Sequence, residues 1–382
     1  MRFSEQRVFV VFGTRPEAIK LAPVVLALRK HGSFAVQVCA TGQHRDMAGP
    51  VCDFFGITPD FDLAVMQPGQ SLEALTAAIL STLPDVFRAV QPDLVIVQGD
   101  TATAYAAALC AFFHRVRIAH VEAGLRTFDL GAPWPEEGFR SMIGRLADYH
   151  FAPTQGAYRN LIEEGARGEL VVTGNTVVDA ARIAAARLEG VHSRQIALRL
   201  GVSSTGRKRI LFTMHRRESF GDGVQRVLVA LDEIARKEDV EILFPVHPNP
   251  SVREPAERIL GGNPNVRLIE PLGYDEIIFA LQNCSILVTD SGGLAEEAPA
   301  FGTPALILRE STERPECVEC GNAILVGQDA ARLKALVGEL LTGGELYASM
   351  SSAPNPFGDG RAADRIATLL AGPTAARLVA AA

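Results

Sequence analysis

Short runs of β-branched and apolar residues alternate with longer stretches of helical periodicity along nearly the whole chain. This alternation is typical of βαβ units, in which a helix returns the chain to the start of a parallel strand. Runs such as Leu94–Val97 and Ile286–Thr289 contain almost no polar residue, as expected for strands that helices cover on both faces. The pattern therefore predicts an α/β fold built on doubly wound parallel sheets.

The predicted strands form two groups. In the first half they are Arg7–Phe12, Phe34–Ala40, Asp93–Val97, Arg117–Val121, Tyr149–Ala152 and Glu169–Val172. In the second half they are Arg209–Thr213, Val240–Val246, Asn265–Ile269, Ile286–Thr289, Ala305–Leu308 and Ile324–Val326. The helices predicted in the first half include Pro16–Lys30, Leu72–Ala89 and Thr103–His114. Because the chain of 382 residues exceeds the roughly 250–300 residues at which one core stops growing, two domains are expected.

The composition excludes several classes of protein. Hydrophobic residues make up 48% and charged residues 21% of the chain, within the range of folded globular proteins. A net charge of −7 favours neither nucleic acid nor an anionic membrane as a partner. The most apolar stretch, Ala102–Phe113, is shorter than the ~20 residues of a membrane-spanning helix, and the N-terminus lacks the pattern of a signal peptide. We expect a cytoplasmic protein.

The six cysteines are scattered along the chain, as is typical of reduced thiols in a cytosolic protein. Only Cys317 and Cys320 form a CxxC pair, whereas a structural zinc site needs about four ligands. We therefore expect structural thiols and no metal.

Polar residues that directly follow strands are the first candidates for a site, because open parallel sheets bind ligands beyond the carboxyl ends of their strands. After the first predicted strand, Gly13 permits a tight turn, and Arg15 and the start of a helix that carries Lys20 would face an anion. The alternative is an ordinary capped helix with an exposed arginine.

Three carboxylates also follow predicted strands or open a helix. Asp100 and Glu122 end two successive strands, so one βαβ step places them at the same edge of the sheet. Glu136 opens a helix after the proline-flanked segment Pro133–Pro135. Clustered carboxylates can divide acid and base roles between them. Each has a plain alternative role, such as an N-cap for Asp100 or a first-turn helix residue for Glu136.

In the second half, the strand Arg209–Thr213 is followed by His215 and Arg216, which can handle a proton and hold a phosphate. The alternative is a structural histidine. The turn Ser291–Gly293 bares backbone N–H groups before a helix that carries Glu297, which favours a diphosphate, and Arg314 follows the next strand. The sequence contains neither a GxGxxG dinucleotide fingerprint after the first strand nor a GxxxxGK[ST] loop.

The chain contains a series of motifs in a fixed order: FGTRPEAIK, TGQHRDM, QGDT, HVEAGLRT, PWPEE, HRRES, PVHPNP, TDSGG with EEAP, TERPE and a closing NPFGDG. In these motifs and their order the chain resembles the non-hydrolysing UDP-N-acetylglucosamine 2-epimerases. These motifs run from about Val10 to Gly360, which is nearly the whole chain.

This resemblance implies a GT-B architecture of two Rossmann-like domains, with the active site in the cleft between them and the final helix, Arg361–Leu378, returning to the first domain. On this basis the first domain spans residues 1–172 and 361–382, and the second spans residues 173–360. Asp100, Glu122, Glu136 and His215 are implied to serve the chemistry. The residues implied to bind the UDP-sugar are Arg15, Lys20, His215, Leu272, Ile277, Ser291, Gly292, Gly293, Glu297 and Arg314.

The implied activity is the interconversion of UDP-N-acetylglucosamine and UDP-N-acetylmannosamine for bacterial surface polysaccharides. C2 of the sugar is not adjacent to a carbonyl, and many epimerases therefore oxidise the sugar transiently with NAD. The absence of a dinucleotide fingerprint argues against that cofactor, and the resemblance implies elimination of UDP to a 2-acetamidoglucal followed by its re-addition. Which of the three carboxylates removes the C2 proton stays open.

The resemblance further implies a homodimer and a second, activating nucleotide-sugar site formed by Gln43, Arg216 and His247 together with Glu136. Asp46 and Gly69 depart from residues that some relatives carry there, and Ile277 replaces an aromatic residue near the uracil. Three alternative functions share parts of this pattern. They are a GT-B glycosyltransferase that uses a UDP-sugar, a hydrolysing 2-epimerase and a nucleotide-sugar sensor without activity.

Overall fold

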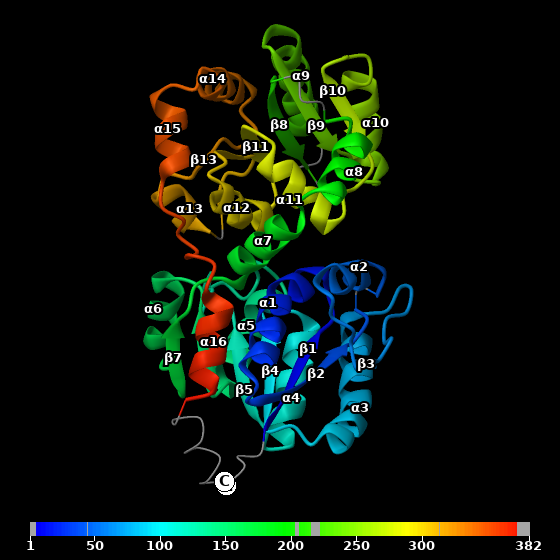
Figure 1. The fold of residues 1–382 in the computed structure, drawn as a ribbon, viewed down its shortest axis with the longest axis vertical. Coiled ribbons are helices and arrows are strands. Elements are labelled where there is room, and N and C mark those ends of the chain that lie inside the picture. Colours follow the sequence, from blue (N-terminus) through cyan, green and yellow to red (C-terminus); the bar gives the residue numbers. More distant parts are fainter. Residues whose placement is uncertain (1–4, 44, 203–205, 215–221, 313, 373–382) are drawn as a thin grey trace. The chain divides into compact units, whose positions relative to one another are not determined.

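The chain forms two compact α/β units in a computed structural model that describes residues 5–43, 45–202, 206–214, 222–312 and 314–372 (Figure 1). One unit runs to Ala180 and resumes at Phe357, and the other is the continuous segment Ala181–Pro356. We call these unit 1 and unit 2. The expectation of two parallel-sheet domains is therefore confirmed.

Unit 1 contains a seven-stranded parallel sheet in the order β3-β2-β1-β4-β5-β6-β7. Its strands are β1 Gln6–Phe12, β2 Phe34–Ala40, β3 Phe61–Asp62, β4 Leu94–Gln98, β5 Arg117–Val121, β6 Tyr149–Ala152 and β7 Glu169–Val172. Its helices are α1 Arg15–His31, α2 Arg45–Phe55, α3 Leu72–Val90, α4 Ala102–Phe113, α5 Glu136–Leu146, α6 Gln155–Glu163 and α16 Ala362–Leu370, with the start of α7 Thr176–Arg187. The short strand β3 was not predicted.

Unit 2 contains a six-stranded parallel sheet in the order β10-β9-β8-β11-β12-β13. Its strands are β8 Lys208–Thr213, β9 Val240–Pro245, β10 Val266–Ile269, β11 Ile286–Thr289, β12 Ala305–Ile307 and β13 Ala323–Leu325. Its helices are α8 Val191–Leu200, α9 Asp222–Lys237, α10 Pro250–Leu260, α11 Tyr274–Gln282, α12 Gly292–Glu297, η2 Ala298–Phe301, α13 Pro315–Glu319, α14 Ala330–Leu341 and α15 Glu345–Ser352. In both sheets each strand end lies within about one residue of its prediction, because the apolar runs stop where the chain leaves the core.

Each sheet is covered by helices on its two faces. In unit 1, Phe9 and Val95 pack with residues of α3, α4 and α5 on one face. The fully buried Val8 and Val10 alternate with Phe9 along β1 and so point to the other face, where α1 packs against α2 and α16. The apolar character of both faces explains why these strands show no alternation in the sequence.

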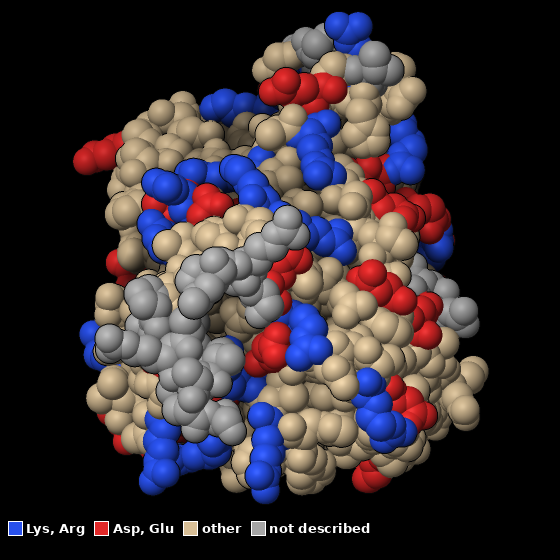
Figure 2. Space-filling view, turned by 60° about the horizontal axis from the view of Figure 1, so that its bottom comes forward, with Lys and Arg blue, Asp and Glu red and all other residues tan. Residues whose placement is uncertain are grey.

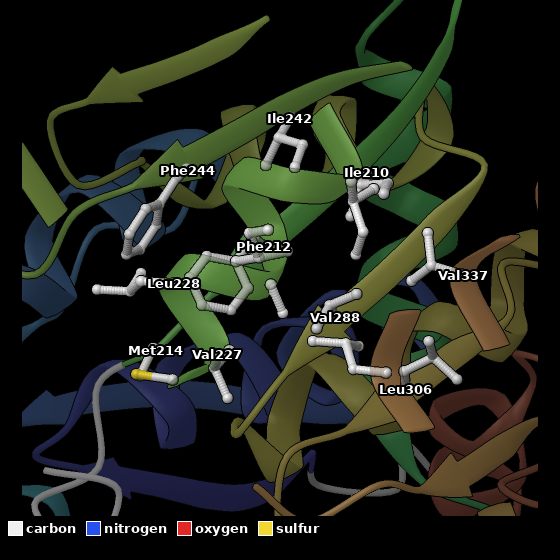
Figure 3. Packing of buried hydrophobic residues seen from close by; sticks show 14 of the residues in the cluster. Ile210, Phe212, Met214, Val227, Leu228, Ile242, Phe244, Val288, Leu306 and Val337 are labelled. Atoms are coloured by element: carbon white, nitrogen blue, oxygen red, sulfur yellow. The ribbon is translucent and has the colours of Figure 1, made fainter. Parts of the chain in front are cut away.

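Unit 2 has a core of its own, part of which Figure 3 shows. Phe212 of β8 and Phe244 of β9 meet edge to face, with ring centroids 4.5 Å apart, and Leu228 of α9 lies beside them (Figure 3). Val288 of β11 and Leu306 of β12 continue this layer of side chains. Because all of these residues lie between Ala181 and Pro356, the unit buries its apolar surface within one continuous segment.

The chain leaves unit 1 within α7 and returns before α16. The N–H of Asn175 donates to the carbonyl of Phe357 (2.8 Å), and the carboxylate of Asp179 caps α16 at the N–H groups of Ala362 (3.2 Å) and Ala363 (2.8 Å). These contacts extend unit 1 beyond the expected boundary at residue 172 and bring its return forward from residue 361. The final helix joins unit 1, as the resemblance implies, and ends at Leu370, before its predicted end at Leu378. Residues 373–378 lie outside the described part.

Basic and acidic side chains are interspersed on the face of the molecule that Figure 2 shows. Among the described residues, no helix is long and apolar enough to cross a membrane.

Candidate active site

The turn between β1 and α1 is built around a buried carboxylate. Thr14 is the N-cap of α1, and Oε2 of Glu17 accepts the backbone N–H groups of Gly13 (3.0 Å) and Thr14 (2.8 Å) in a capping box. Oε1 of Glu17 accepts the hydroxyl of Thr101 at the start of α4 (2.7 Å). Burial raises the pKa of Glu17 to about 7, although these donors act to lower it. Glu17 thus joins the ends of β1 and β4, where half-buried Arg15 also lies.

Gly13 is required at this turn for reasons of space. A Cβ at this position would overlap the hydroxyls of Thr41 and Thr103, which are hydrogen-bonded to each other (2.8 Å). Thr103 also donates to Oε1 of Gln43 (2.9 Å), so Gln43, expected in the second nucleotide-sugar site, lies beside the β1–α1 turn. The side chain of Asp46, from the same expected site, lies outside the described part of the structure, and Gly69 is described with φ +71°.

Glu122 and Lys20 form a buried ion pair at the end of β5. The ammonium of Lys20 contacts Oε2 of Glu122, and the side chains are 9% and 7% exposed. The amide Nδ2 of Asn175 donates to the same oxygen (3.1 Å). The structure therefore brings together two of the predicted site residues, which lie 102 positions apart in the sequence. A buried charge pair of this kind needs such additional donors to offset the cost of desolvation.

Asp100 follows β4, and register pairing of Gln98 with Val121 places it at the same sheet edge as Glu122, as the βαβ spacing predicts. Its Oδ2 lies 3.2 Å from Nε of Arg140 on α5. The same Nε lies 3.3 Å from Oε2 of Glu137, and Arg140 is buried. A single guanidinium is thus shared by two carboxylates, and it orients Asp100 at the rim of the site.

Glu136 is the first residue of α5 and is half-buried, one position before the buried Glu137. Its carbonyl oxygen lies 3.4 Å from Nε of Arg140, so the start of α5 and Asp100 share this arginine. Glu137 accepts the N–H groups of Thr127 (3.1 Å) and Phe128 (3.0 Å) and thereby holds the preceding loop. Glu137 has a structural role, whereas Glu136 remains a candidate for chemistry.

Beneath this edge lies His120, which is completely buried in β5. Its Nε2 lies 2.7 Å from the carbonyl of Gly99 and must carry the proton, because a carbonyl only accepts. Burial lowers the pKa of His120 to about 3. The ring is therefore neutral at physiological pH and supports the Gly99–Asp100 turn.

In unit 2, Ser291 caps α12, whose first residues are Gly292 and Gly293. The two glycines therefore belong to the helix, which begins earlier than the predicted start near Leu294, because the side chain of Ser291 accepts the N–H of Leu294 (3.4 Å). Arg314 precedes α13, and a Cβ on Gly292 would lie 3.2 Å from its Nη1. Arg314 is also paired with the buried Glu296. The guanidinium is thus held beside bare backbone at the start of α12.

The other predicted residues of unit 2 that the structure describes lie on or next to α11, α12 and β9. Leu272 is buried just before α11, Ile277 is half-buried within it, and Glu297 is buried at the end of α12. His247 is half-buried, and its Nδ1 accepts the N–H of Asn249 (3.1 Å). His215 and Arg216, predicted for the chemistry and the second site, lie outside the described residues.

Three residues of this site were missed by sequence reasoning: Glu17, Arg140 and Asn175. Glu17 was detectable, since Thr14 and Glu17 have the spacing of a capping box. No local pattern marks the contact of Arg140 with Asp100 or that of Asn175 with Glu122, because these partners lie on distant elements.

The sequence profile of the UDP-N-acetylglucosamine 2-epimerases matches residues 26–371. The chain is 46% identical over 364 residues to a UDP-N-acetylglucosamine 2-epimerase of Yersinia pestis, covering 94% of this chain and 97% of that protein. The chain belongs to the UDP-N-acetylglucosamine 2-epimerase family.

Solved structures of this epimerase family share the fold. The UDP-GlcNAc 2-epimerase of Neisseria meningitidis, determined bound to UDP-GlcNAc, is 41% identical, with a TM-score of 0.89 over 96% of this chain and 99% of that one. The Methanocaldococcus jannaschii 2-epimerase, in complex with UDP-GlcNAc and UDP, is 33% identical, with a TM-score of 0.80 over 96% and 99% of the two chains. The confirmed epimerase family and fold agree with the resemblance that the sequence motifs indicate.

Proposed function

We propose that this epimerase interconverts UDP-N-acetylglucosamine and UDP-N-acetylmannosamine by eliminating UDP and adding it back. The observation that carries the proposal is the pair of carboxylates, Asp100 and Glu122, held at one sheet edge by Arg140 and Lys20 in a chain of this family. The relatives are named as 2-epimerases, so the reaction is an isomerisation at C2.

In the proposed first step a carboxylate takes the proton from C2, the electron pair of the C2–H bond forms the C1–C2 double bond, and the C1–O bond to UDP breaks. The products are UDP and 2-acetamidoglucal. In the second step a phosphate oxygen of UDP bonds to C1 while an acid group protonates C2 from the opposite face. Asp100, Glu122 and Glu136 are the candidate base and acid, and their separate roles stay open.

Unit 1 supports this assignment through the environments of its carboxylates. Glu122 is buried and paired with Lys20, whereas the side chain of Asp100 is 27% exposed beside Arg140. Two carboxylates in different environments at one edge are suited to giving and taking protons in turn. We assign His215 to the same chemistry on the basis of the family motif.

Unit 2 supplies the proposed site for the diphosphate. Arg314 lies beside Gly292 at the start of α12. Because Gly292 and Gly293 have no side chains, the backbone N–H groups of this first helical turn are not covered by a side chain of either residue. Charge on the departing UDP would be stabilised there by backbone donors and the guanidinium. Leu272, Ile277 and Glu297 are assigned to the rest of the nucleotide, and Arg15 of unit 1 to its phosphates.

The reaction as proposed needs no nicotinamide, because elimination replaces transient oxidation of the sugar. It predicts that hydrogen at C2 exchanges with solvent while the nucleotide sugar stays intact. The test is incubation of the protein with UDP-N-acetylglucosamine in D2O without NAD, followed by NMR. Deuterium at C2 of intact UDP-N-acetylmannosamine is the expected result. Epimerisation with retained protium at C2 would overturn the mechanism.

The same experiment separates the alternative functions. A hydrolysing 2-epimerase would release free N-acetylmannosamine and UDP, because water would trap the intermediate. A glycosyltransferase would leave C2 protonated and would transfer sugar only to an added acceptor. A sensor would bind the nucleotide sugar and leave it unchanged.

We also propose a second, activating nucleotide-sugar site that includes Gln43, Arg216 and His247, and a homodimer. Support for the site comes from the family motifs and from the position of Gln43 beside the β1–α1 turn. Initial rates measured over a range of UDP-N-acetylglucosamine concentrations should rise sigmoidally, and sedimentation should give twice the chain mass. We assign the product to the synthesis of bacterial surface polysaccharides.

A further inference from the structure

Asn175 is a buried amide that contacts one of the proposed reacting carboxylates. It lies in the segment between β7 and α7, and 3% of its surface is exposed. Its Nδ2 donates to Oε2 of Glu122 over 3.1 Å, and Lys20 contacts the same oxygen. Two donors from distant parts of the chain therefore converge on one oxygen of Glu122.

The orientation of this amide is determined by its other contacts. Oδ1 of Asn175 accepts the backbone N–H of Val177 (3.1 Å), so the oxygen must face the start of α7. The NH₂ group must then point at Glu122. The backbone N–H of Asn175 donates to the carbonyl of Phe357 (2.8 Å), which belongs to the segment that returns to unit 1. The side-chain amide therefore cannot turn over without losing its bonds to Val177 and Glu122.

The backbone of Glu122 needs this kind of support. Its φ angle is +63°, in the left-handed region that a residue with a Cβ rarely adopts. Such a conformation is strained and persists where surrounding contacts hold it. Lys20 and Asn175 hold the side chain at Oε2, and Oε1 is the oxygen that remains to act on a substrate.

We infer that Asn175 is a positioning residue for the epimerase reaction: it orients Glu122 for proton transfer and ties that carboxylate to the segment Thr173–Asn175, where the chain passes toward unit 2. The inference rests on the proposed function, since it assumes that Glu122 takes part in the chemistry. It assigns a role to an uncharged residue outside the predicted set.

The decisive variant is Asn175→Asp. The introduced carboxyl keeps the acceptor for Val177, and the backbone bond to Phe357 is unchanged, so we expect the variant to fold. The donor toward Glu122 is lost, and a negative charge replaces it. A hydrogen bond to a charged group contributes about 1.5–3 kcal/mol, so we expect kcat and C2 deuterium exchange to fall roughly ten- to a hundredfold together. We expect KM and UDP affinity to stay within about twofold of the wild type.

A pH profile distinguishes positioning from a merely structural role. The Asn175 amide contacts the carboxylate of Glu122, and Lys20 contacts the same carboxylate oxygen. When the introduced carboxyl is protonated it can donate to Glu122 again, so the rate of Asn175→Asp relative to wild type should rise as pH falls. A structural role predicts a constant ratio.

The matched control is Asp179→Ala. It removes the cap of α16, where the chain has returned to unit 1, and leaves the contacts of Glu122 in place. We expect it to lower the melting temperature and leave kcat unchanged. Wild-type rates of deuterium exchange in Asn175→Asp would overturn the positioning role, as would a loss of kcat in Asp179→Ala equal to that in Asn175→Asp. Absence of exchange in the wild type would instead overturn the proposed function itself.

Discussion

At the scale of single residues, the site depends on charged side chains whose partners lie far away in the chain. Arg140 holds Asp100, Lys20 holds Glu122, and Glu296 holds Arg314. A buried charge without a partner carries a large desolvation cost. Each pairing therefore offsets the cost of burying its charges and sets the direction in which the reactive group points.

Substitution of Asp100 by Asn tests the carboxylate cluster. Asn keeps the size of the side chain and an oxygen that can accept from Arg140, but it cannot exchange a proton. We expect C2 deuterium exchange to fall at least a hundredfold, the range that general acid–base groups contribute, with UDP affinity close to normal. NMR in D2O measures the exchange and calorimetry measures UDP binding. Turnover equal to wild type would remove Asp100 from the mechanism.

Glu17 should make stability depend on pH. Its pKa is raised by burial from 4.5 to about 7, so the folded chain holds a proton that the unfolded chain loses. The contribution of Glu17 to the free energy of unfolding is fully present below pH 4.5 and is lost as pH rises to about 7. The difference is about 3 kcal/mol. Glu17→Gln cannot ionise and should lack this decline.

Urea unfolding of wild type and Glu17→Gln at about pH 5 and about pH 8 measures the effect. The free energy of unfolding of the variant relative to wild type should be higher at the higher pH. Glu163→Gln, at an exposed position on α6, is the control and should follow the wild type. If wild type and Glu17→Gln lose stability in parallel, the raised pKa is wrong.

At the scale of elements, helix ends do much of the positioning. Thr14 and Glu17 cap α1, Thr101 caps α4, and Ser291 caps α12, each at the carboxyl end of a strand. A cap fixes where a helix starts and so fixes the residue that faces the ligand. The final helix is different, because its cap, Asp179, comes from α7.

Removal of this cap should loosen α16. Asp179→Ala leaves the buried N–H groups of Ala362 and Ala363 without their acceptor. Loss of an N-cap costs about 0.5–2 kcal/mol, and we expect the upper half of that range because the site is buried. Asp364→Ala, exposed in the first turn of the same helix, should cost less than about 0.5 kcal/mol. Equal losses of unfolding free energy in the two variants would contradict this role.

At the scale of the whole molecule, the two units differ in how they are assembled from the chain. Unit 2 is one continuous segment with its own core, whereas unit 1 needs the returning helix α16, whose Ile366 and Leu370 are buried. Helix α16 packs against α1, which carries Arg15 and Lys20. The end of the chain thus supports the site at its beginning.

Fragments of the chain should reflect this difference. The segment 181–356 should fold alone and bind UDP weakly, because its core is complete. The segment 1–180 should be unstable or aggregate, because the surface that α16 covers is exposed. Circular dichroism during heating measures the unfolding of both fragments, with full-length protein as the reference. Cooperative melting of segment 1–180 at the full-length temperature would show that α16 adds nothing to unit 1.

The sequence by itself determined the local structure and the edges of the sheets. The apolar runs predicted all but the two-residue strand β3, and the spacing of Asp100 and Glu122 placed them at one edge, because a βαβ unit has a fixed direction. The ordered motifs identified the family. These features depend on residues that are near one another in the chain, where periodicity and turn chemistry act.

Only the tertiary structure decided which side chains hold the reactive groups and where the units divide. Lys20 meets Glu122 over 102 positions and Asn175 meets it over 53, and no local pattern encodes such pairs. The chain leaves unit 1 after Ala180 and returns at Phe357, later and earlier than the sequence predicted. The reason is that Asn175 bonds to Phe357 and Asp179 bonds to Ala363. Contacts of this kind form only when packing brings distant elements together, since their energy comes from burial and charge pairing.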